Sequence, residues 1–140
     1  MIQVEIQKIN KDSILPTKAN PTDVGFDLYS DEEYVIFPGQ RQLIKTGIKI
    51  NLPDFLELQI RPRSGLAYKS GITVLNTPGT IDPGYTDELK VLLINLGESK
   101  FQVTKGMRIA QAVVQHKLDI ELVETVIDTP SRGGFGSSGK

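Results

Sequence analysis

An aspartate and a tyrosine lie three positions apart on a predicted turn in the middle of the chain. The stretch 79–85 reads Gly-Thr-Ile-Asp-Pro-Gly-Tyr. Pro83 presets φ and Gly84 tolerates positive φ, so this pair predicts a tight turn. The apolar run 91–94 that follows predicts a strand with both faces buried. Such a support would hold a reactive carboxylate still, although Asp82 taken alone could serve only to start the turn.

A cation and a hydroxyl stand where the one predicted helical turn begins. Arg63, Ser64 and Gly65 follow an alternating strand pattern, and Ser64 is the expected N-cap of a turn over 64–69. Free backbone N–H groups at a helix start, together with a guanidinium, could bind an anion such as phosphate. The alternative is an ordinary helix cap beside a solvated arginine.

Two further stretches give weaker signals. Asp23 and Asp27 are oxygen ligands at close spacing, which suggests a divalent metal ion or its bound waters, although acids in a loop can simply be solvated. Gln111, in the stretch 106–112, is flanked by small alanines that would let a ligand approach. An ordinary strand after a turn explains the same residues.

The C-terminal stretch has the composition of a nucleotide-closing segment. Its glycines expose backbone amides, Phe135 could stack on a base, and Arg132 and Lys140 could meet phosphates. Residues 134–140 match the letters of a P-loop, but no strand precedes them and no helix can follow, so the match is spurious. A terminus without a partner is the alternative.

The composition restricts the class of protein. A chain of 140 residues fits one domain, and its net charge of −1 gives no basic footprint for nucleic acid or for a membrane surface. The absence of cysteine excludes disulfides and thiolate metal sites. The single histidine, His116, predicts neither a histidine metal cluster nor a Ser-His-Asp triad. No spanning run or signal peptide is visible, so a cytoplasmic location is expected.

The elements that must position these residues are strands. Thirteen glycines and eight prolines divide short β-rich runs, which is typical of an all-β sandwich, jelly roll or barrel. We expect one domain over 1–128 and a flexible nucleotide-closing tail over 129–140. The strand at 42–50 contains Gly47, which could form a bulge. The predicted strands are 2–6, 26–29, 34–37, 42–50, 56–60, 72–75, 91–94, 101–103, 108–115 and 118–127.

Taken together, these stretches resemble the five ordered motifs of the homotrimeric dUTPases (dUTP diphosphatases). The motifs are 25–28 (Gly-Phe-Asp-Leu), 63–65 (Arg-Ser-Gly), 79–82 with Tyr85, 106–111 (Gly-Met-Arg-Ile-Ala-Gln) and 133–139 (Gly-Gly-Phe-Gly-Ser-Ser-Gly). The resemblance implies a distorted jelly roll of the β-clip type and a homotrimer with sites shared between subunits. It also implies hydrolysis of dUTP to dUMP and diphosphate with Mg²⁺, which supplies dUMP for thymidylate synthesis and keeps uracil out of DNA.

The resemblance also implies a role for each candidate residue. Asp82 would activate the water that attacks the α-phosphorus, Tyr85 would pack under the deoxyribose, and Asn76 would read the uracil edge. Further substrate contacts would come from Thr80, Ile81 and Lys90. The phosphates would be held by Arg63, Ser64, Gly65 and Gln111. Asp27 would act through water on a magnesium ion held mainly by the triphosphate.

The tail carries the last set of implied roles and one departure. Phe135 would stack over uracil while Gly136, Ser137 and Ser138 wrap the γ-phosphate. Many members carry an arginine five residues before the phenylalanine, where this chain has Pro130. Arg132 is the nearest arginine, so either it takes that role in a shorter tail or the contact is altered.

Two other functions could use the same scaffold. The related dCTP deaminases, including the bifunctional deaminase-diphosphatases, have a similar hairpin. They need a glutamate three residues before the asparagine that ends the strand, and here Leu92 stands three residues before Asn95. Leucine cannot shuttle protons, which argues against deamination. A non-catalytic nucleotide-binding regulator is the other alternative, but such a module would need neither Asp82 nor the closing tail.

Overall fold

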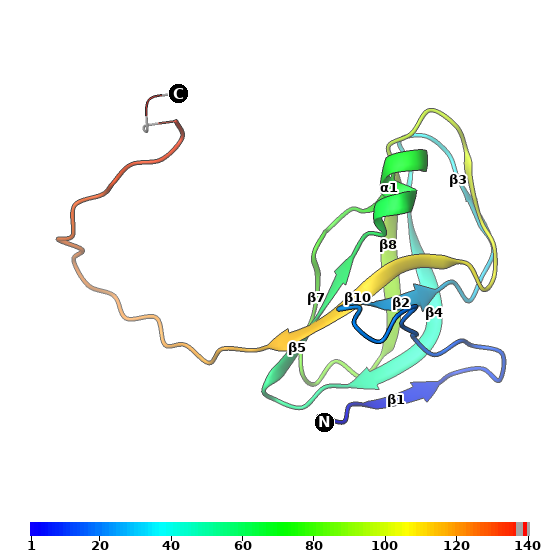
Figure 1. Cartoon of the computed structure of the whole chain (residues 1–140), viewed down its shortest axis with the longest axis horizontal. Helices are drawn as coiled ribbons and strands as arrows, with labels where there is room; N and C mark the ends of the chain where they lie inside the picture. The colour runs from blue at the N-terminus through cyan, green and yellow to red at the C-terminus, as the bar shows by residue number, and fades with distance from the viewer. Residues whose placement is uncertain (137–138, 140) are drawn as a thin grey trace.

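The structure, a computed structural model, describes residues 1–136 and 139, and it is built almost entirely from β-strands (Figure 1). One four-stranded sheet has the order β1-β4-β8-β6, and a second has the order β2-β10-β5-β7. A two-stranded ribbon pairs β3 with β9. The predicted all-β, jelly-roll-like class is therefore confirmed. The strands are β1 (Glu5–Lys8), β2 (Phe26–Tyr29), β3 (Tyr34–Ile36), β4 (Arg41–Asn51), β5 (Leu56–Arg61), β6 (Ile72–Val74), β7 (Gly79–Ile81), β8 (Glu88–Asn95), β9 (Phe101–Val103) and β10 (Arg108–His116).

The core lies between the two larger sheets and follows the period-two pattern of the strands. In β5, Leu56, Leu58 and Ile60 are buried while the residues between them are half-buried. Successive side chains of a strand point to opposite faces, so one face of β5 packs inward and the other carries polar groups. Leu89, Val91 and Leu93 of β8 belong to the same core cluster. The outer face of β5 thus carries its polar residues, and those of β8 lie on its outer face except for the buried Asn95.

Strand β4 contains the predicted bulge. The pairing of β4 with β8 shifts register between Lys45 and Lys49, and Gly47 has φ +72°. A Cβ added to Gly47 would lie 2.3 Å from Ser13 Oγ, so glycine is required both for the backbone and for the space. The Gly47 N–H donates to Glu88 Oε2 at 2.8 Å, which ties the bulge to the start of β8.

The one helix among the described residues is α1 (Ser64–Ser70), and none of them forms a helix long and apolar enough to cross a membrane. The predicted N-cap at Ser64 is wrong. The cap is Arg63, whose backbone is extended and whose carbonyl accepts the first helical hydrogen bond from Ala67 N at 3.0 Å. Ser64 is already inside the helix, and no side chain caps the first turn.

Three strand predictions also differ from the structure. The first strand, predicted over 2–6 as half-buried, is β1 at Glu5–Lys8, and its four residues are exposed. The apolar run 91–94 in β8 is not buried on both faces, because Leu92 and Ile94 are only half-buried. Residues 79–81, expected as part of a turn, form β7, which pairs with β5.

The predicted strand over 118–127 is wrong. These residues form neither strand nor helix, and their apolar side chains are exposed, with Leu122 at 89%. Figure 1 shows the chain leaving the folded body after β10 and running away from it. The alternating pattern predicted a half-buried strand, but the described part of a single chain offers it no surface to cover. We call residues 118–130 the arm.

Asn95 fastens the end of β8 to the two-stranded ribbon. Its side chain is fully buried, donates to Ile36 O at 2.8 Å and to Ser99 O at 2.9 Å, and accepts from Gly97 N at 2.9 Å. A buried polar group that loses its hydrogen-bond partner lowers the free energy of unfolding far more than an exposed group does. The amide therefore satisfies three backbone groups that alanine would leave unpaired.

We expect Asn95→Ala to lower the free energy of unfolding by about 2–4 kcal/mol, because backbone groups are left buried without partners. Asn51→Ala is the matched control, since Asn51 is exposed and bonds only to the exposed side chain of Glu5. Denaturant unfolding at fixed protein concentration measures both variants. Equal stability losses in the two variants would contradict this role for Asn95.

Candidate active site

A carboxylate on β2 holds two arginines from separate parts of the chain. Asp27 Oδ1 lies 3.5 Å from Arg63 Nε, and Asp27 Oδ2 lies 3.5 Å from Arg108 Nη1. The Asp27 side chain is only 19% exposed, whereas the two arginine side chains reach solvent. Two positive charges face one negative charge, so the group has a net positive charge that could attract an anion. Arg108 was not among the predicted site residues, although it lies within the predicted motif 106–111.

Gln111 is the neutral member of this cluster. Its Cα is paired with Asp27 across β2 and with Arg61 across β5, so it lies at the centre of the sheet. Paired residues of an antiparallel sheet point to the same face. Gln111 Nε2 donates to Pro62 O at 3.0 Å, and Pro62 is the residue directly before Arg63. We call Asp27, Arg63, Arg108 and Gln111, with the exposed Ser64 and Gly65 at the start of α1, the anion cluster.

The hairpin between β7 and β8 carries the second group of predicted residues. Asp82 is exposed at the end of β7, and Tyr85 N donates to Asp82 O at 3.2 Å across the predicted Pro83-Gly84 turn. The turn prediction is confirmed, with φ +91° at Gly84. The Tyr85 hydroxyl donates to Glu88 O at 2.9 Å, which holds the half-exposed ring against the start of β8.

Four other predicted residues surround this turn. Asn76 is exposed just before β7, and its Nδ2 lies 3.4 Å from the position that a Cβ on Gly79 would occupy. Thr80 and Ile81 belong to β7, and Lys90 is exposed on β8. We call Asn76, Thr80, Ile81, Asp82, Tyr85 and Lys90 the hairpin cluster.

Within residues 1–136, no network of side-chain bonds joins the predicted groups, although β2, β10 and β7 belong to one sheet. No side-chain hydrogen bond or ion pair within residues 1–136 joins the anion cluster to the hairpin cluster. Arg132, Phe135 and Gly136 are exposed, and Figure 1 shows the chain before residue 137 running far from α1 and β7. Ser137 and Ser138 lie outside the described residues. The described residues therefore present three sets of functional groups that no side-chain bond joins.

The described residues contain no protein cage for a metal ion. No group of three or more His, Cys, Asp or Glu side chains converges in them. Asp27 stands alone as a carboxylate beside two guanidiniums. Mg²⁺ often binds through only one or two carboxylates, with the remaining ligands from waters and substrate phosphates. The donor set of this cluster is therefore compatible with Mg²⁺.

The family follows from a comparison with protein-family models. The model described as dUTPase matches residues 11–139, which is nearly the whole chain. This chain belongs to the dUTPase family. A relative named deoxyuridine 5'-triphosphate nucleotidohydrolase, from Clostridioides difficile, is 53% identical over 142 aligned residues and covers 99% of each chain.

Solved structures agree with the fold of this dUTPase-family chain. The dUTPase of Staphylococcus bacteriophage 80alpha with dUpNHpp has a TM-score of 0.91 at 24% identity and covers 100% of each chain. The dUTPase of phage phi11 of S. aureus, described with a structural Mg(II) ion, has a TM-score of 0.84 at 20% identity and covers 91% of this chain and 100% of that one. At this identity the likeness shows the shared fold.

The Tyr85 hydroxyl gives a test of the hairpin geometry. We expect Tyr85→Phe to lower the free energy of unfolding by about 0.5–1 kcal/mol, because one partly exposed hydrogen bond is lost. Tyr34→Phe is the control, since the Tyr34 hydroxyl has no hydrogen-bond partner within the described part of the chain and its ring is similarly exposed, 42% against 40%. Denaturant unfolding compares the two. Indistinguishable losses would contradict the Tyr85–Glu88 bond.

Proposed function

We propose that this protein hydrolyses dUTP to dUMP and diphosphate. The observation that carries the proposal is the full-length, 53% identical relative named for this activity, taken with the presence of both residue clusters in this chain. The reaction would supply dUMP for thymidylate synthesis and keep uracil out of DNA. The cytoplasmic location expected from the sequence stays a prediction.

The anion cluster would bind the triphosphate. Arg63 and Arg108 supply positive charge beside the exposed backbone N–H groups of Ser64 and Gly65. Charged donors arranged before the substrate arrives stabilise the charge that develops on transferring phosphate oxygens. Gln111 would add a neutral donor, because one of its two Nε2 N–H groups remains after Pro62 O has taken the other.

Asp82 would act as the general base. Its exposed carboxylate on the rigid turn would accept a proton from water while the water oxygen bonds to the α-phosphorus. The bond from that phosphorus to the bridging oxygen breaks, and diphosphate leaves with the electron pair. The backbone bond from Tyr85 N to Asp82 O supports this role, because it fixes the turn that carries the carboxylate.

The remaining residues of the hairpin cluster would select the nucleoside. Asn76 and backbone groups of the same hairpin would match the donor and acceptor pattern of uracil, and cytosine would leave groups unpaired. The Tyr85 ring, held by its bond to Glu88 O, would exclude a ribose 2'-hydroxyl. Further substrate contacts would come from Thr80, Ile81 and Lys90.

Magnesium fits this site as an ion bound to the substrate. Mg²⁺ would offset negative charge on the triphosphate when bound. In this chain, Asp27 would orient a water of that ion while holding Arg63 and Arg108 within reach of the phosphates.

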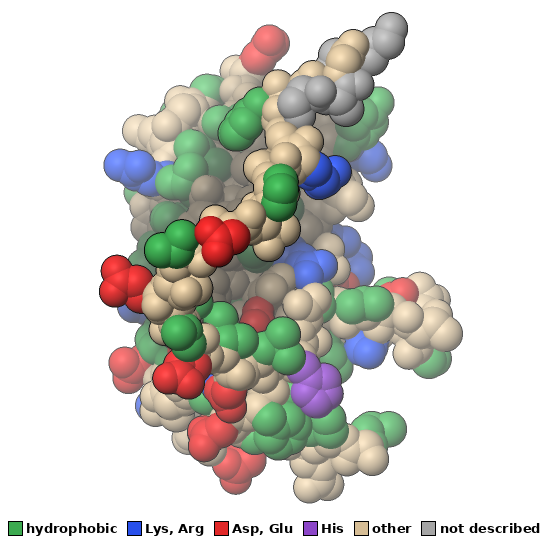
Figure 2. Space-filling view, turned by 90° about the vertical axis from the view of Figure 1, so that its left-hand side faces the viewer, with side chains coloured by type: hydrophobic (Ala, Val, Ile, Leu, Met, Phe, Trp, Pro, Cys, Tyr) green, Lys and Arg blue, Asp and Glu red, His purple; other side chains and the backbone are tan. Residues whose placement is uncertain are grey.

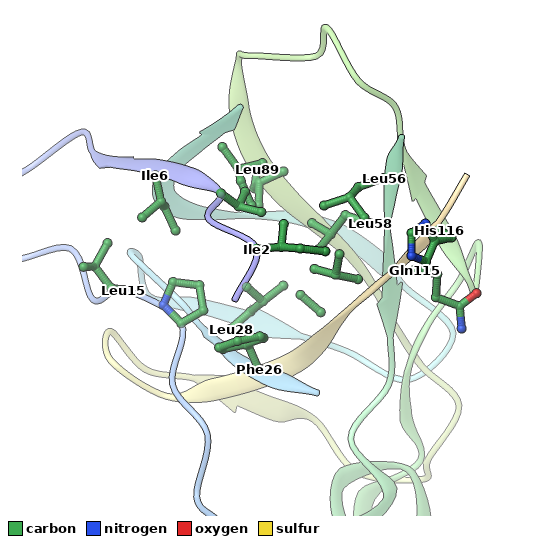
Figure 3. Close-up of a pocket in the computed structure, with 15 residues that line it drawn as sticks. Ile2, Ile6, Leu15, Phe26, Leu28, Leu56, Leu58, Leu89, Gln115 and His116 are labelled. Atoms are coloured by element: carbon green, nitrogen blue, oxygen red, sulfur yellow. The ribbon is translucent and has the colours of Figure 1, made fainter. Parts of the chain in front are cut away.

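We propose that three copies assemble and share their sites, because the described chain leaves the anion cluster, the hairpin cluster and the tail apart. An apolar cavity of about 540 Å³ supports assembly. Figure 3 shows side chains from β1, β2 and β5 pointing into it, including Ile6, Phe26 and Leu58. Figure 2 shows hydrophobic side chains beside the histidine on the face that the arm leaves.

The exposed side chains of the arm and the lining of this open cavity are both apolar, and water contacts both in a single chain. In the proposed trimer, the arm of one copy covers the cavity of another. The tail beyond the arm then closes a site on a neighbouring copy, with Phe135 over uracil. Arg132, Gly136, Ser137 and Ser138 would surround the phosphates.

Neither rival function gains support from the fold. Leu92 is half-buried in β8 three residues before Asn95, where a deaminase of the related family would need a glutamate. A purely regulatory nucleotide-binding module would not hydrolyse any nucleotide. A product assay separates these functions from hydrolysis of dUTP.

We expect the purified protein with Mg²⁺ to release diphosphate from dUTP and much less from dCTP, dTTP or UTP. Asp82→Asn keeps the size of the side chain and removes the base, so it should still bind dUTP while turnover falls at least about 1,000-fold. Product chromatography on all four nucleotides, with isothermal titration for the variant, measures both. Equal turnover of the four nucleotides, deamination of dCTP, or full activity in Asp82→Asn would contradict the proposal.

A further inference from the structure

The glycine that precedes β2 lies against the side chain of Gln111. A Cβ built on Gly25 would lie 2.2 Å from Gln111 Oε1 and 3.1 Å from Gln111 Cδ. A contact of 2.2 Å is too short for a real Cβ atom and any other heavy atom that is not bonded to it. Gln111 can therefore keep its observed position only if residue 25 has no side chain.

Backbone strain does not explain this glycine. Gly25 is not among the glycines with positive φ, so its backbone is open to alanine as well. The nearest atom that a methyl group would meet, Gln111 Oε1, is the far end of a flexible side chain and can rotate away. Gln111 Cβ, at 3.3 Å, would need to shift by only a few tenths of an ångström. Alanine at residue 25 should therefore displace the Gln111 amide at little cost to the fold.

The displaced amide would lose a specific contact. Gln111 Nε2 donates to Pro62 O at 3.0 Å, and Pro62 immediately precedes Arg63 of the anion cluster. Strand pairing fixes the Gln111 backbone between Asp27 and Arg61, so only the side chain can move. Rotation away from residue 25 would break the bond to Pro62 O and move the second N–H away from the phosphates.

We propose that Gly25 is a positioning residue, whose missing side chain sets the place of the Gln111 amide in the phosphate site. Its catalytic consequence rests on the proposed function, because Gln111 would contact the triphosphate of dUTP. Gly25 itself touches no reacting atom. The proposal therefore predicts that its effect disappears when the Gln111 side chain is absent.

A double-mutant cycle tests this coupling. We expect Gly25→Ala to lower kcat/KM for dUTP roughly 10- to 100-fold. This is the effect expected when one hydrogen bond to a charged group is lost. In a Gln111→Ala background the same change should alter kcat/KM by less than about 2-fold, because no amide remains to displace. Val24→Ala is the matched control, since Val24 is exposed in the same loop and should leave activity unchanged.

A spectroscopic measurement separates this inference from the proposed function. The side-chain amide resonances of Gln111, assigned with Gln111→Ala, should shift in Gly25→Ala and not in Val24→Ala, while the melting temperature stays within about 3 °C. Unshifted resonances, or an equal loss of kcat/KM with and without Gln111, would overturn the positioning role. Absence of dUTP turnover in the unaltered protein would instead overturn the proposed function and leave the amide measurement valid.

Discussion

Strand β10 pairs with β2 on one side and with β5 on the other, and this register places Gln111 opposite both Asp27 and Arg61. Because side chains alternate along a strand, a shift of one residue would turn Gln111 inward and expose the buried Ala110 and Ala112. The buried neighbours of Gln111 therefore hold it on the outer face. Asp27 lies on β2, and Arg108 begins β10 beyond a register shift between Arg108 and Ala110, so the Asp27–Arg108 ion pair also depends on how these two strands pair.

The separate clusters and the exposed apolar surfaces have one common explanation. In a single chain, the arm exposes apolar side chains and the apolar cavity is open. Contact between this apolar surface and water is unfavourable in free energy. If other copies of the chain cover these surfaces, less apolar surface contacts water, and a second set of functional groups comes near the first. Assembly and site formation would then be the same event in the proposed trimer.

Local signals in the sequence predicted the local structure well. The Pro83-Gly84 turn, the bulge at Gly47 and most strands followed from backbone preferences and alternation. The ion pairs of Asp27 joined residues far apart in the sequence, so no local pattern could show them or indicate Arg108. The sequence pattern overestimates the burial of the run 91–94 and predicts a strand in the arm that does not form. An apolar pattern shows which side chains favour burial, but whether they are buried depends on another surface that packs against them.

Subunit complementation tests most directly whether the site is shared between copies. Asp82→Asn removes the base from the hairpin cluster, and Arg63→Ala removes a cation from the anion cluster, so each variant alone should be nearly inactive. When the two are unfolded together and refolded at equal amounts, random assembly should restore about a quarter of wild-type dUTP hydrolysis, because some sites combine two intact clusters. A mixture that stays as inactive as either variant would contradict a site built from more than one chain.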